Sequence, residues 1–169
     1  SGQAGDDVLD GGTGADVMTG GDGEDTYLVY DIGDLVIEAI GEGTDTVLSG
    51  ITYSLTSNVE NLILSGTATI DGTGNELDNV LTGNTGANVL TGGSGNDSYV
   101  IGAGDVVVEA AGEGTDTVVT AQDYVLGDAI ENLSLTGNHS VNGVGNELDN
   151  RLVGNTATNV LQGGLGDDT

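Results

Sequence analysis

The chain has 169 residues, of which 28 are acidic and only one is an arginine or lysine, so its formal net charge is −27. This balance excludes nucleic acid as a partner and disfavours an anionic membrane surface, because the chain has no basic footprint. No apolar stretch reaches the length of a membrane-spanning helix, so we expect no membrane insertion, and the lack of cysteine excludes a disulfide framework. The charge and the 32 glycines are typical of disorder, and a compact state would need a cation to offset the carboxylates.

A nine-residue pattern, G-G-x-G-x-D-x-U-x with U apolar, starts at residue 2 and recurs along the chain. Its occurrences are GQAGDDVLD (2–10), GGTGADVMT (11–19), GGDGEDTYL (20–28), VYDIGDLVI (29–37), IGEGTDTVL (40–48), GGSGNDSYV (92–100), AGEGTDTVV (111–119) and GGLGDDT (163–169). The glycines permit a positive φ, so the first six residues predict a turn, and the alternation in the last three predicts a short strand with U inward. The predicted inward side chains are Leu9, Met18, Tyr27, Val36, Val47, Leu81, Leu90, Tyr99, Val118, Leu152 and Leu161.

Two turn–strand steps return the chain to its starting side, so about 18 residues form one coil and successive coils stack as parallel strands about 4.8 Å apart. The sequence therefore predicts an all-β parallel solenoid that runs as one continuous body over residues 1–169. A longer repeat with an offset of 71 residues divides this body, and we expect internal units at about 2–73, 74–144 and, in part, 145–169. Because the chain begins and ends inside a repeat, we expect it to be a fragment of a longer protein.

Two kinds of segment depart from the nine-residue pattern. Residues 49–70 and 120–141 have longer apolar runs and no G-x-G-x-D, so we expect longer strands there, held by side-chain packing. Residues 74–91 and 145–162 keep the spacing but replace the aspartate with asparagine, at Asn79, Asn88, Asn150 and Asn159. Asparagine at one position per coil favours a hydrogen-bonded ladder, and whether these turns bind metal stays open at this point.

The aspartate turns have the chemistry of calcium ligands. Ca²⁺ takes six to eight hard oxygen ligands at about 2.3–2.6 Å, and one turn supplies only one aspartate and a few carbonyls. We therefore expect each ion between two turns that lie one coil apart. The aspartate pairs with this spacing are Asp7–Asp25, Asp16–Asp34, Asp25–Asp45 and Asp97–Asp116. The alternative is that these side chains only cap their turns through local hydrogen bonds.

The nonads, at fixed register over nearly the whole chain, resemble the RTX (repeats-in-toxin) family of calcium-binding repeats. The resemblance implies a right-handed parallel β-roll that binds several Ca²⁺ ions. It also implies a secreted or cell-surface protein of a Gram-negative bacterium that type I secretion machinery exports as an unfolded chain. In the RTX pattern, the ion takes carbonyl oxygens and the aspartate of one turn, and carbonyl oxygens and the aspartate of the turn one coil further on.

Carried onto this chain, the resemblance implies four paired sites and one further half-site. The implied ligands are Gln3, Gly5 and Asp7 with Gly20, Asp22 and Asp25; Gly21, Gly23 and Asp25 with Ile40, Glu42 and Asp45; Gly12, Gly14 and Asp16 with Val29, Asp31 and Asp34; Gly93, Gly95 and Asp97 with Ala111, Glu113 and Asp116; and Asp168 alone. Gln3 and Ile40 stand where the pattern has glycine, and the turn 29–34 lacks the opening glycines.

These features favour a calcium-binding structural module over an enzyme. His139 is the only histidine, and a calcium ion saturated by protein ligands leaves no open position for catalysis. We expect a chain that is disordered without Ca²⁺, folds outside the cell, and serves as the scaffold of an adhesin or fibre, with end-to-end self-association. One alternative is a polysaccharide- or ice-binding surface. Ice binding would use rows of threonines, and Val144 and Val153 interrupt those rows. The other alternative is an accessory C-terminal module of a secreted enzyme.

Overall fold

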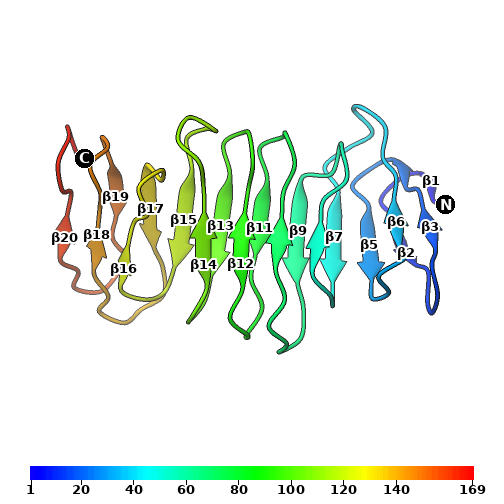
Figure 1. The fold of residues 1–169 in the computed structure, drawn as a ribbon, viewed down its shortest axis with the longest axis horizontal. Helices are drawn as coiled ribbons and strands as arrows, with labels where there is room; N and C mark the ends of the chain where they lie inside the picture. Colours follow the sequence, from blue (N-terminus) through cyan, green and yellow to red (C-terminus); the bar gives the residue numbers. More distant parts are fainter.

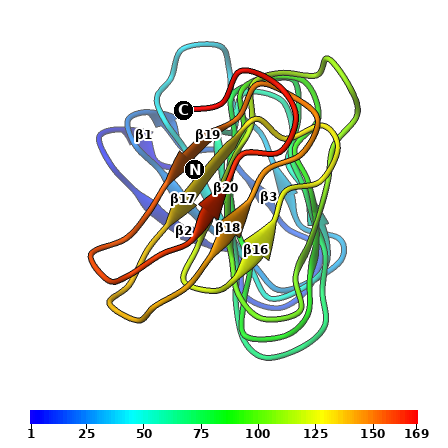
Figure 2. The same ribbon diagram turned by 90° about the vertical axis from the view of Figure 1, so that its left-hand side faces the viewer.

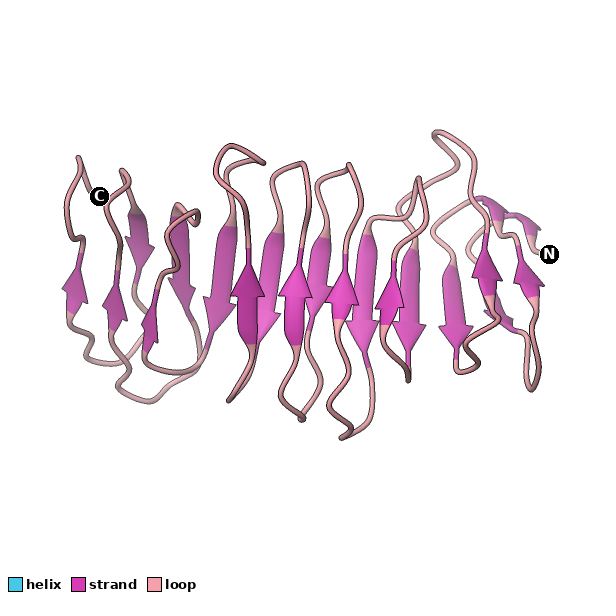
Figure 3. Cartoon of the chain, in the orientation of Figure 1, coloured by secondary structure: helices cyan, strands magenta, loops and turns pink.

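The computed structural model describes residues 1–169 as twenty short strands without a helix (Figure 1). The strands lie side by side along the long axis, and the two termini lie at opposite ends of the stack. Turns and loops connect the strands at both edges, as Figure 3 shows. The predicted all-β parallel solenoid is therefore confirmed. Because the chain contains no helix, it has none that is long and apolar enough to cross a membrane.

One face of the solenoid is a single nine-stranded sheet, and the other face is divided. The continuous sheet contains β2 (Val8–Asp10), β5 (Thr26–Val29), β7 (Thr46–Ser49), β9 (Asn61–Leu64), β11 (Val80–Thr82), β13 (Ser98–Ile101), β15 (Thr117–Thr120), β17 (Asn132–Leu135) and β19 (Arg151–Val153). The divided face contains β3 (Val17–Met18) with β6 (Leu35–Val36); β8 (Tyr53–Ser54), β10 (Gly72–Thr73), β12 (Val89–Thr91) and β14 (Val106–Val108); and β16 (Tyr124–Val125), β18 (Gly143–Val144) and β20 (Leu161–Gln162). The remaining pair is β1 (Gln3–Ala4) with β4 (Gly21–Asp22), inside the glycine turns.

All pairings are parallel, and their register gives the length of each coil. Tyr27 pairs with Leu9 and with Val47, so side chains at the U position stack on one another from coil to coil. The coil between Val47 and Leu62 is shorter than its neighbours, and the same shortening recurs between Val118 and Leu133. Viewed along the axis, the coils superpose as a flattened ring, with the C-terminal coils turned relative to the central ones (Figure 2).

The inward U positions form the core as predicted, except at the end of the stack. Met18, Tyr27, Val36, Val47, Leu81, Leu90, Tyr99 and Val118 are buried. Leu9 and Leu152 are half-buried and pack against this core. Leu161 is 40% exposed, because its strand pairs with β18 alone and no further coil covers it.

The expectation of longer strands in 49–70 and 120–141 is wrong. The main strands there, β9 and β17, have four residues each, which is also the length of β5, β7, β13 and β15. The extra apolar residues instead fill the corners of the coil, where Leu55, Val59 and Ile70 are buried outside any strand. The width of the sheet therefore stays constant while the number of buried side chains per coil rises.

The divided face is interrupted twice, between β6 and β8 and between β14 and β16. The chain leaves β6 through residues 37–45 and leaves β14 through residues 109–116, and both segments lead into an aspartate turn. These two segments also contain Glu38 and Glu109, two acidic residues that precede the nine-residue pattern.

Candidate metal centres

The first glycine of each turn makes room for the aspartate of that turn. A Cβ atom at Gly20 would collide with the carboxylate of Asp25, and one at Gly92 would collide with that of Asp97. Later glycines of the turn adopt positive φ, and Gln3, which stands at such a position, has a φ of 131°. The carboxylates therefore fold back against the backbone of their own turns, into the interior of the stack.

One oxygen of each aspartate links its turn to the preceding coil. The N–H of Asp7 donates to Oδ1 of Asp25 over 2.7 Å, and the N–H of Asp25 donates to Oδ1 of Asp45 over 2.9 Å. The N–H of Asp45 in turn donates to Oε2 of Glu60 over 2.8 Å. This ladder of carboxylates runs across four successive coils.

The second unit repeats the ladder with one substitution. The N–H of Asn79 donates to Oδ1 of Asp97 over 2.7 Å, and the N–H of Asp97 donates to Oδ1 of Asp116 over 2.8 Å. The N–H of Asp116 donates to Oε2 of Glu131 over 2.8 Å. These hydrogen bonds join one coil to the next, so they are not the local caps of the alternative interpretation.

The other oxygen of the central aspartates has no partner in the chain. Oδ2 is buried and accepts no hydrogen bond in Asp16, Asp25, Asp45 and Asp97. An ionised oxygen buried in this way is costly unless it gains a proton or a cation. The only basic residue besides His139 is Arg151 in β19, whose side chain is exposed, so the cation would come from solution. Hard carboxylate oxygens are the donors that Ca²⁺ prefers, and these residues fit that ion.

Two groups of three carboxylates stand out in this arrangement. One oxygen each from Asp25, Glu38 and Asp45 lie within 4.8 Å of one another, and so do oxygens from Asp97, Glu109 and Asp116. Glu38 and Glu109 were not among the predicted ligands, because they precede the nonad frame of their turns. Their recurrence at the 71-residue offset was the available signal, in the related segments VIEAIGEGTDTV and VVEAAGEGTDTV.

Burial raises the pKa of five of these six carboxylates. Burial, with the neighbouring Asp45 carboxylate, raises the pKa of Glu38 to about 7. Burial, with Asp116 nearby, likewise raises the pKa of Glu109 to about 7. Burial also raises the pKa of Asp97 to about 6, against the opposing effect of its backbone hydrogen bond. Without a cation, each group therefore holds its negative charges at a free-energy cost at neutral pH.

Residues 1–28, 73–108 and 144–169, together more than half of the chain, match the family of RTX calcium-binding nonapeptide repeats (4 copies). The chain belongs to this RTX family. The resemblance found in the sequence is thereby confirmed, and with it the assignment of calcium-binding β-roll repeats, a type of module that is structural.

A curated relative shares part of the RTX chain. The endo-1,3-1,4-beta-glycanase ExsH of Rhizobium meliloti (strain 1021) is 40% identical over 57 residues. The match covers 34% of this chain but 12% of the glycanase, so the chain spans only a small part of that relative. No solved structure matches the chain.

The RTX turns bring the predicted aspartate pairs together. Several of the carbonyl groups predicted as ligands accept backbone hydrogen bonds from the preceding coil. The carbonyls of Gly20 and Asp22 accept the N–H groups of Gln3 (2.7 Å) and Gly5 (2.6 Å). The carbonyls of Glu42 and Glu113 likewise accept N–H groups, from Gly23 (2.7 Å) and Gly95 (2.8 Å). A carbonyl oxygen has two lone pairs, so one remains on each for a metal ion.

On the opposite edge of the first unit, the aspartate of the turn 29–34 has both of its oxygens hydrogen-bonded within the chain. Oδ2 of Asp34 accepts the N–H groups of Tyr30 and Asp31, and Oδ1 accepts that of Asp16 over 3.2 Å. Although burial raises the pKa of Asp34, these three donors outweigh it and lower the pKa below its ordinary value. Val29 lies in β5 with its side chain in the core, and its carbonyl accepts the N–H of Gly50. Only Asp16 retains a free buried oxygen at this edge.

Three of the remaining predicted ligands lie at exposed positions. Ile40 is 91% exposed, and Ala111 and Asp168 are also exposed. Oδ1 of Asp168 accepts the N–H of Asn150 over 2.9 Å, so the last turn continues the ladder in the third unit.

The asparagine turns of the RTX chain replace the free oxygen with a hydrogen-bond donor. Nδ2 of Asn79 donates to the carbonyls of Val59 (3.2 Å) and Glu60 (3.1 Å), and Nδ2 of Asn88 donates to that of Ile70 (2.6 Å). Asn150 and Asn159 make equivalent bonds in the next unit. The hydrogen-bonded interpretation is confirmed. The partners are backbone carbonyls one coil back and, for Asn88 and Asn159, also Oδ1 of Asn84 and Asn155 in their own turns.

Proposed function

We propose that this chain is a calcium-dependent structural module of a secreted bacterial protein, disordered without Ca²⁺ and stacked into a solenoid once the ions bind. The observation that carries this proposal is the set of buried, unpartnered Oδ2 atoms in turns whose carboxylates meet those of the neighbouring coil. Since the facing turns belong to different coils, an ion held between them is bound only by the stacked state. Binding free energy would then act directly as folding free energy.

The aspartate pairs are the centres of the proposed sites. Asp25–Asp45 and Asp97–Asp116 are the best supported, because in both pairs the side chains are 1% exposed and lie in one cluster. The carbonyls of the same turns would complete the coordination from their second lone pairs. No third carboxylate joins the Asp7–Asp25 and Asp16–Asp34 pairs in such a cluster, and Asp168 has only the asparagine turn of Asn150 on its ladder.

The setting of the module is proposed from the family. A net charge of −27 keeps the calcium-free chain expanded, which suits export by type I secretion machinery from a Gram-negative cell and folding in the extracellular medium. In this setting the solenoid would act as the scaffold of an adhesin or extracellular fibre.

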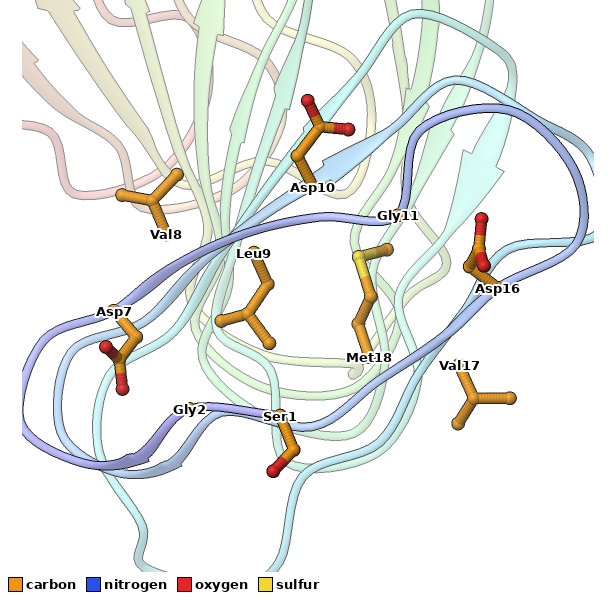
Figure 4. Close-up of a pocket in the computed structure, with 10 residues that line it drawn as sticks. All are labelled: Ser1, Gly2, Asp7, Val8, Leu9, Asp10, Gly11, Asp16, Val17 and Met18. Atoms are coloured by element: carbon orange, nitrogen blue, oxygen red, sulfur yellow. The ribbon is translucent and has the colours of Figure 1, made fainter.

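In this proposal, end-to-end association of such modules would bring a second coil onto the first coil of this chain. A hollow of about 400 Å³ opens there, lined by Leu9 and Met18 in the middle and by Asp7 and Asp16 at its two sides (Figure 4). Leu9 and Met18 belong to the inward U positions that stack from coil to coil in the rest of the solenoid. A further coil, from the same or another chain, would cover these side chains.

A second candidate is an accessory module of a secreted enzyme. The observation in its favour is the stretch shared with the glycanase ExsH, 40% identical over 57 residues. In that case catalysis would belong to a part of the protein outside this chain, and the calcium-bound coils would stabilise or present that part.

Titration calorimetry of chelator-stripped protein tests the proposal. We expect several Ca²⁺ ions per chain to bind together with the folding of the chain, because the paired turns of each site meet only in the stacked state. Mg²⁺, which demands a smaller octahedral shell, should compete poorly. Equal heats for the two ions, or no binding of Ca²⁺, would contradict the proposal.

A further inference from the structure

Glu38 and Glu109 occupy equivalent places in the fold. Each lies two residues or fewer beyond a strand of the divided face, β6 or β14, where the sheet is interrupted and the chain turns back toward an aspartate turn. Glu38 stands level with Gly20 of the preceding coil, since Met18 pairs with Val36. At Gly20 any side chain would collide with Asp25. Glu38 and Ala39 are two additional residues before the nonad frame, which starts here at Ile40. The position level with Gly20 can therefore hold a glutamate.

The side chain of Glu38 points into the stack without any partner. It is 7% exposed, and both Oε1 and Oε2 are buried and accept no hydrogen bond. In the second unit, Oε1 of Glu109 accepts the N–H of Gly92 at 3.2 Å, and Oε2 is buried and unpartnered. A carboxylate that only filled space would be replaced at lower cost by an amide or an apolar side chain.

Three carboxylates lie close together in each unit. The carboxylates of Asp25, Glu38 and Asp45 each offer an oxygen within 4.8 Å of the others, and Oδ2 is the free oxygen of both aspartates. Glu38 and Asp45 lie on either side of the turn that starts at Ile40, and Asp25 belongs to the turn one coil before it. Three negative charges thus meet in a buried space to which the chain brings no basic side chain.

We propose that Glu38 and Glu109 are calcium ligands that close two three-carboxylate sites, Asp25–Glu38–Asp45 and Asp97–Glu109–Asp116. The inference rests on the proposed function and adds to it a ligand that the nine-residue pattern does not contain. Affinity for Ca²⁺ rises with the number of charged ligands, so these two sites are the tightest in the chain and fill first. They tie the coil before each interruption of the divided face to the coil after it.

Isosteric variants test this assignment. The E38Q/E109Q double variant removes two charges while keeping side-chain volume, and E38D/E109D keeps the charges but shortens the side chains. The control is E24Q, because Glu24 is exposed, is adjacent to Asp25, and corresponds to the neutral Asn96 in the second unit. Each protein is titrated with Ca²⁺ in competition with a chromophoric chelator, and its calcium-free β content is followed by circular dichroism.

We expect E38Q/E109Q to lose about 10–100-fold in affinity at the two tightest sites, with E24Q unchanged. We also expect E38Q/E109Q to show more β structure than the wild type without calcium, because the substitution removes unpartnered charges. E38D/E109D should bind more tightly than E38Q/E109Q, since it keeps the carboxylates.

Three results would overturn the assignment: wild-type affinity in E38Q/E109Q, an equal loss in E24Q, or weaker binding by E38D/E109D than by E38Q/E109Q. The last result would mean that Glu38 and Glu109 act by packing. Failure of the wild type itself to bind Ca²⁺ is a separate outcome, which overturns the proposed function along with this inference.

Discussion

The aspartate turns and the asparagine turns of this solenoid solve the same structural problem with different chemistry. Both must join one coil to the next through a buried polar side chain at the sixth position of the turn. In the asparagine turns, Nδ2 of Asn88 donates to the carbonyl of Ile70, and Oδ1 accepts the N–H of Asn84, so the amide satisfies itself within the chain. In the aspartate turns, Oδ1 of Asp97 accepts the N–H of Asn79 from the preceding coil, while Oδ2 is left without a partner.

The difference shows where calcium dependence resides in the chain. An amide supplies a hydrogen-bond donor and an acceptor, whereas a carboxylate supplies acceptors only. A buried carboxylate oxygen without a donor therefore needs a cation or a proton as its partner. The asparagine coils therefore form a section that is complete as folded, and the aspartate coils form sections that depend on ions. The backbone of the turns differs as well, because Gly93 and Gly95 of an aspartate turn have positive φ, whereas Gly83 and Gly86 of an asparagine turn do not.

The largest expected effect comes from removing a shared carboxylate. D97A deletes the acceptor for the N–H of Asn79 and one of the three carboxylates of its cluster. We expect a loss of about 3–5 kcal/mol in the free energy of unfolding at saturating calcium, as for breaking a buried charged interaction. Urea denaturation combined with a count of bound ions measures this. A variant that retains every ion would show that Asp97 serves only as a cap.

The matched change in an asparagine turn should separate stability from calcium binding. N88A removes the bonds to Ile70 and Asn84, so we expect a loss of about 1–3 kcal/mol in the free energy of unfolding. The number of bound ions and their affinity should stay at the wild-type values. Loss of an ion on this substitution would contradict the distinction between the two kinds of turn.

The first glycine of an aspartate turn provides a third test. G92A places a Cβ against the carboxylate of Asp97, so we expect a cost of about 1–3 kcal/mol together with weaker calcium binding. The control is G127A, where nothing lies within 4 Å of an added Cβ and φ is not positive. Its effect should stay within about 0.5 kcal/mol. If G92A and G127A lowered the thermal stability equally, Gly92 would contribute only backbone flexibility and not space for the Asp97 carboxylate.

A smaller effect is expected from pH. The pKa values of Glu38 and Glu109 rise to about 7 in the folded state from a reference value of 4.5, so the folded calcium-free chain takes up protons that the unfolded chain releases. The stability of the calcium-free fold is therefore greatest below about pH 4.5 and is lost as pH rises through about 7. Circular dichroism with chelator should show more β structure at pH 5 than at pH 8.

The E38Q/E109Q variant should flatten that pH profile. A chain of net charge −27 also becomes more stable at low pH because protonation reduces the repulsion among all its carboxylates. The difference between the variant and the wild type gives the part of the pH dependence that is due to Glu38 and Glu109. An unchanged profile in the variant would assign the pH dependence to the overall charge.

Much of the fold was predictable from the sequence, because glycine positions and apolar spacing act locally. The turns and the inward positions from Met18 to Val118 follow from the nine-residue frame. The length of the strands in 49–70 was not predictable, since apolar side chains there fill corners such as those of Val59 and Ile70. Apolar content alone does not distinguish a longer strand from a better-packed corner.

The candidate sites were predictable only in part. The aspartate pairs follow from the spacing of the coils. The ladder of N–H groups onto Oδ1 depends on side-chain orientation, which spacing does not specify. Glu38 and Glu109 lie outside the frame, and only the folded path of residues 37–45 and 109–116 brings them to the aspartates.

Far-UV circular dichroism of the chelator-stripped chain, titrated with Ca²⁺ and in parallel with Mg²⁺ at neutral pH, tests the central claim most directly. The claim is that the unpartnered carboxylates of the aspartate turns make stacking conditional on calcium. We predict a cooperative transition from coil to β structure with Ca²⁺ and none with Mg²⁺. A chain that already has its full β content without calcium, and does not respond to it, would show that the aspartate turns are complete as caps and would contradict the claim.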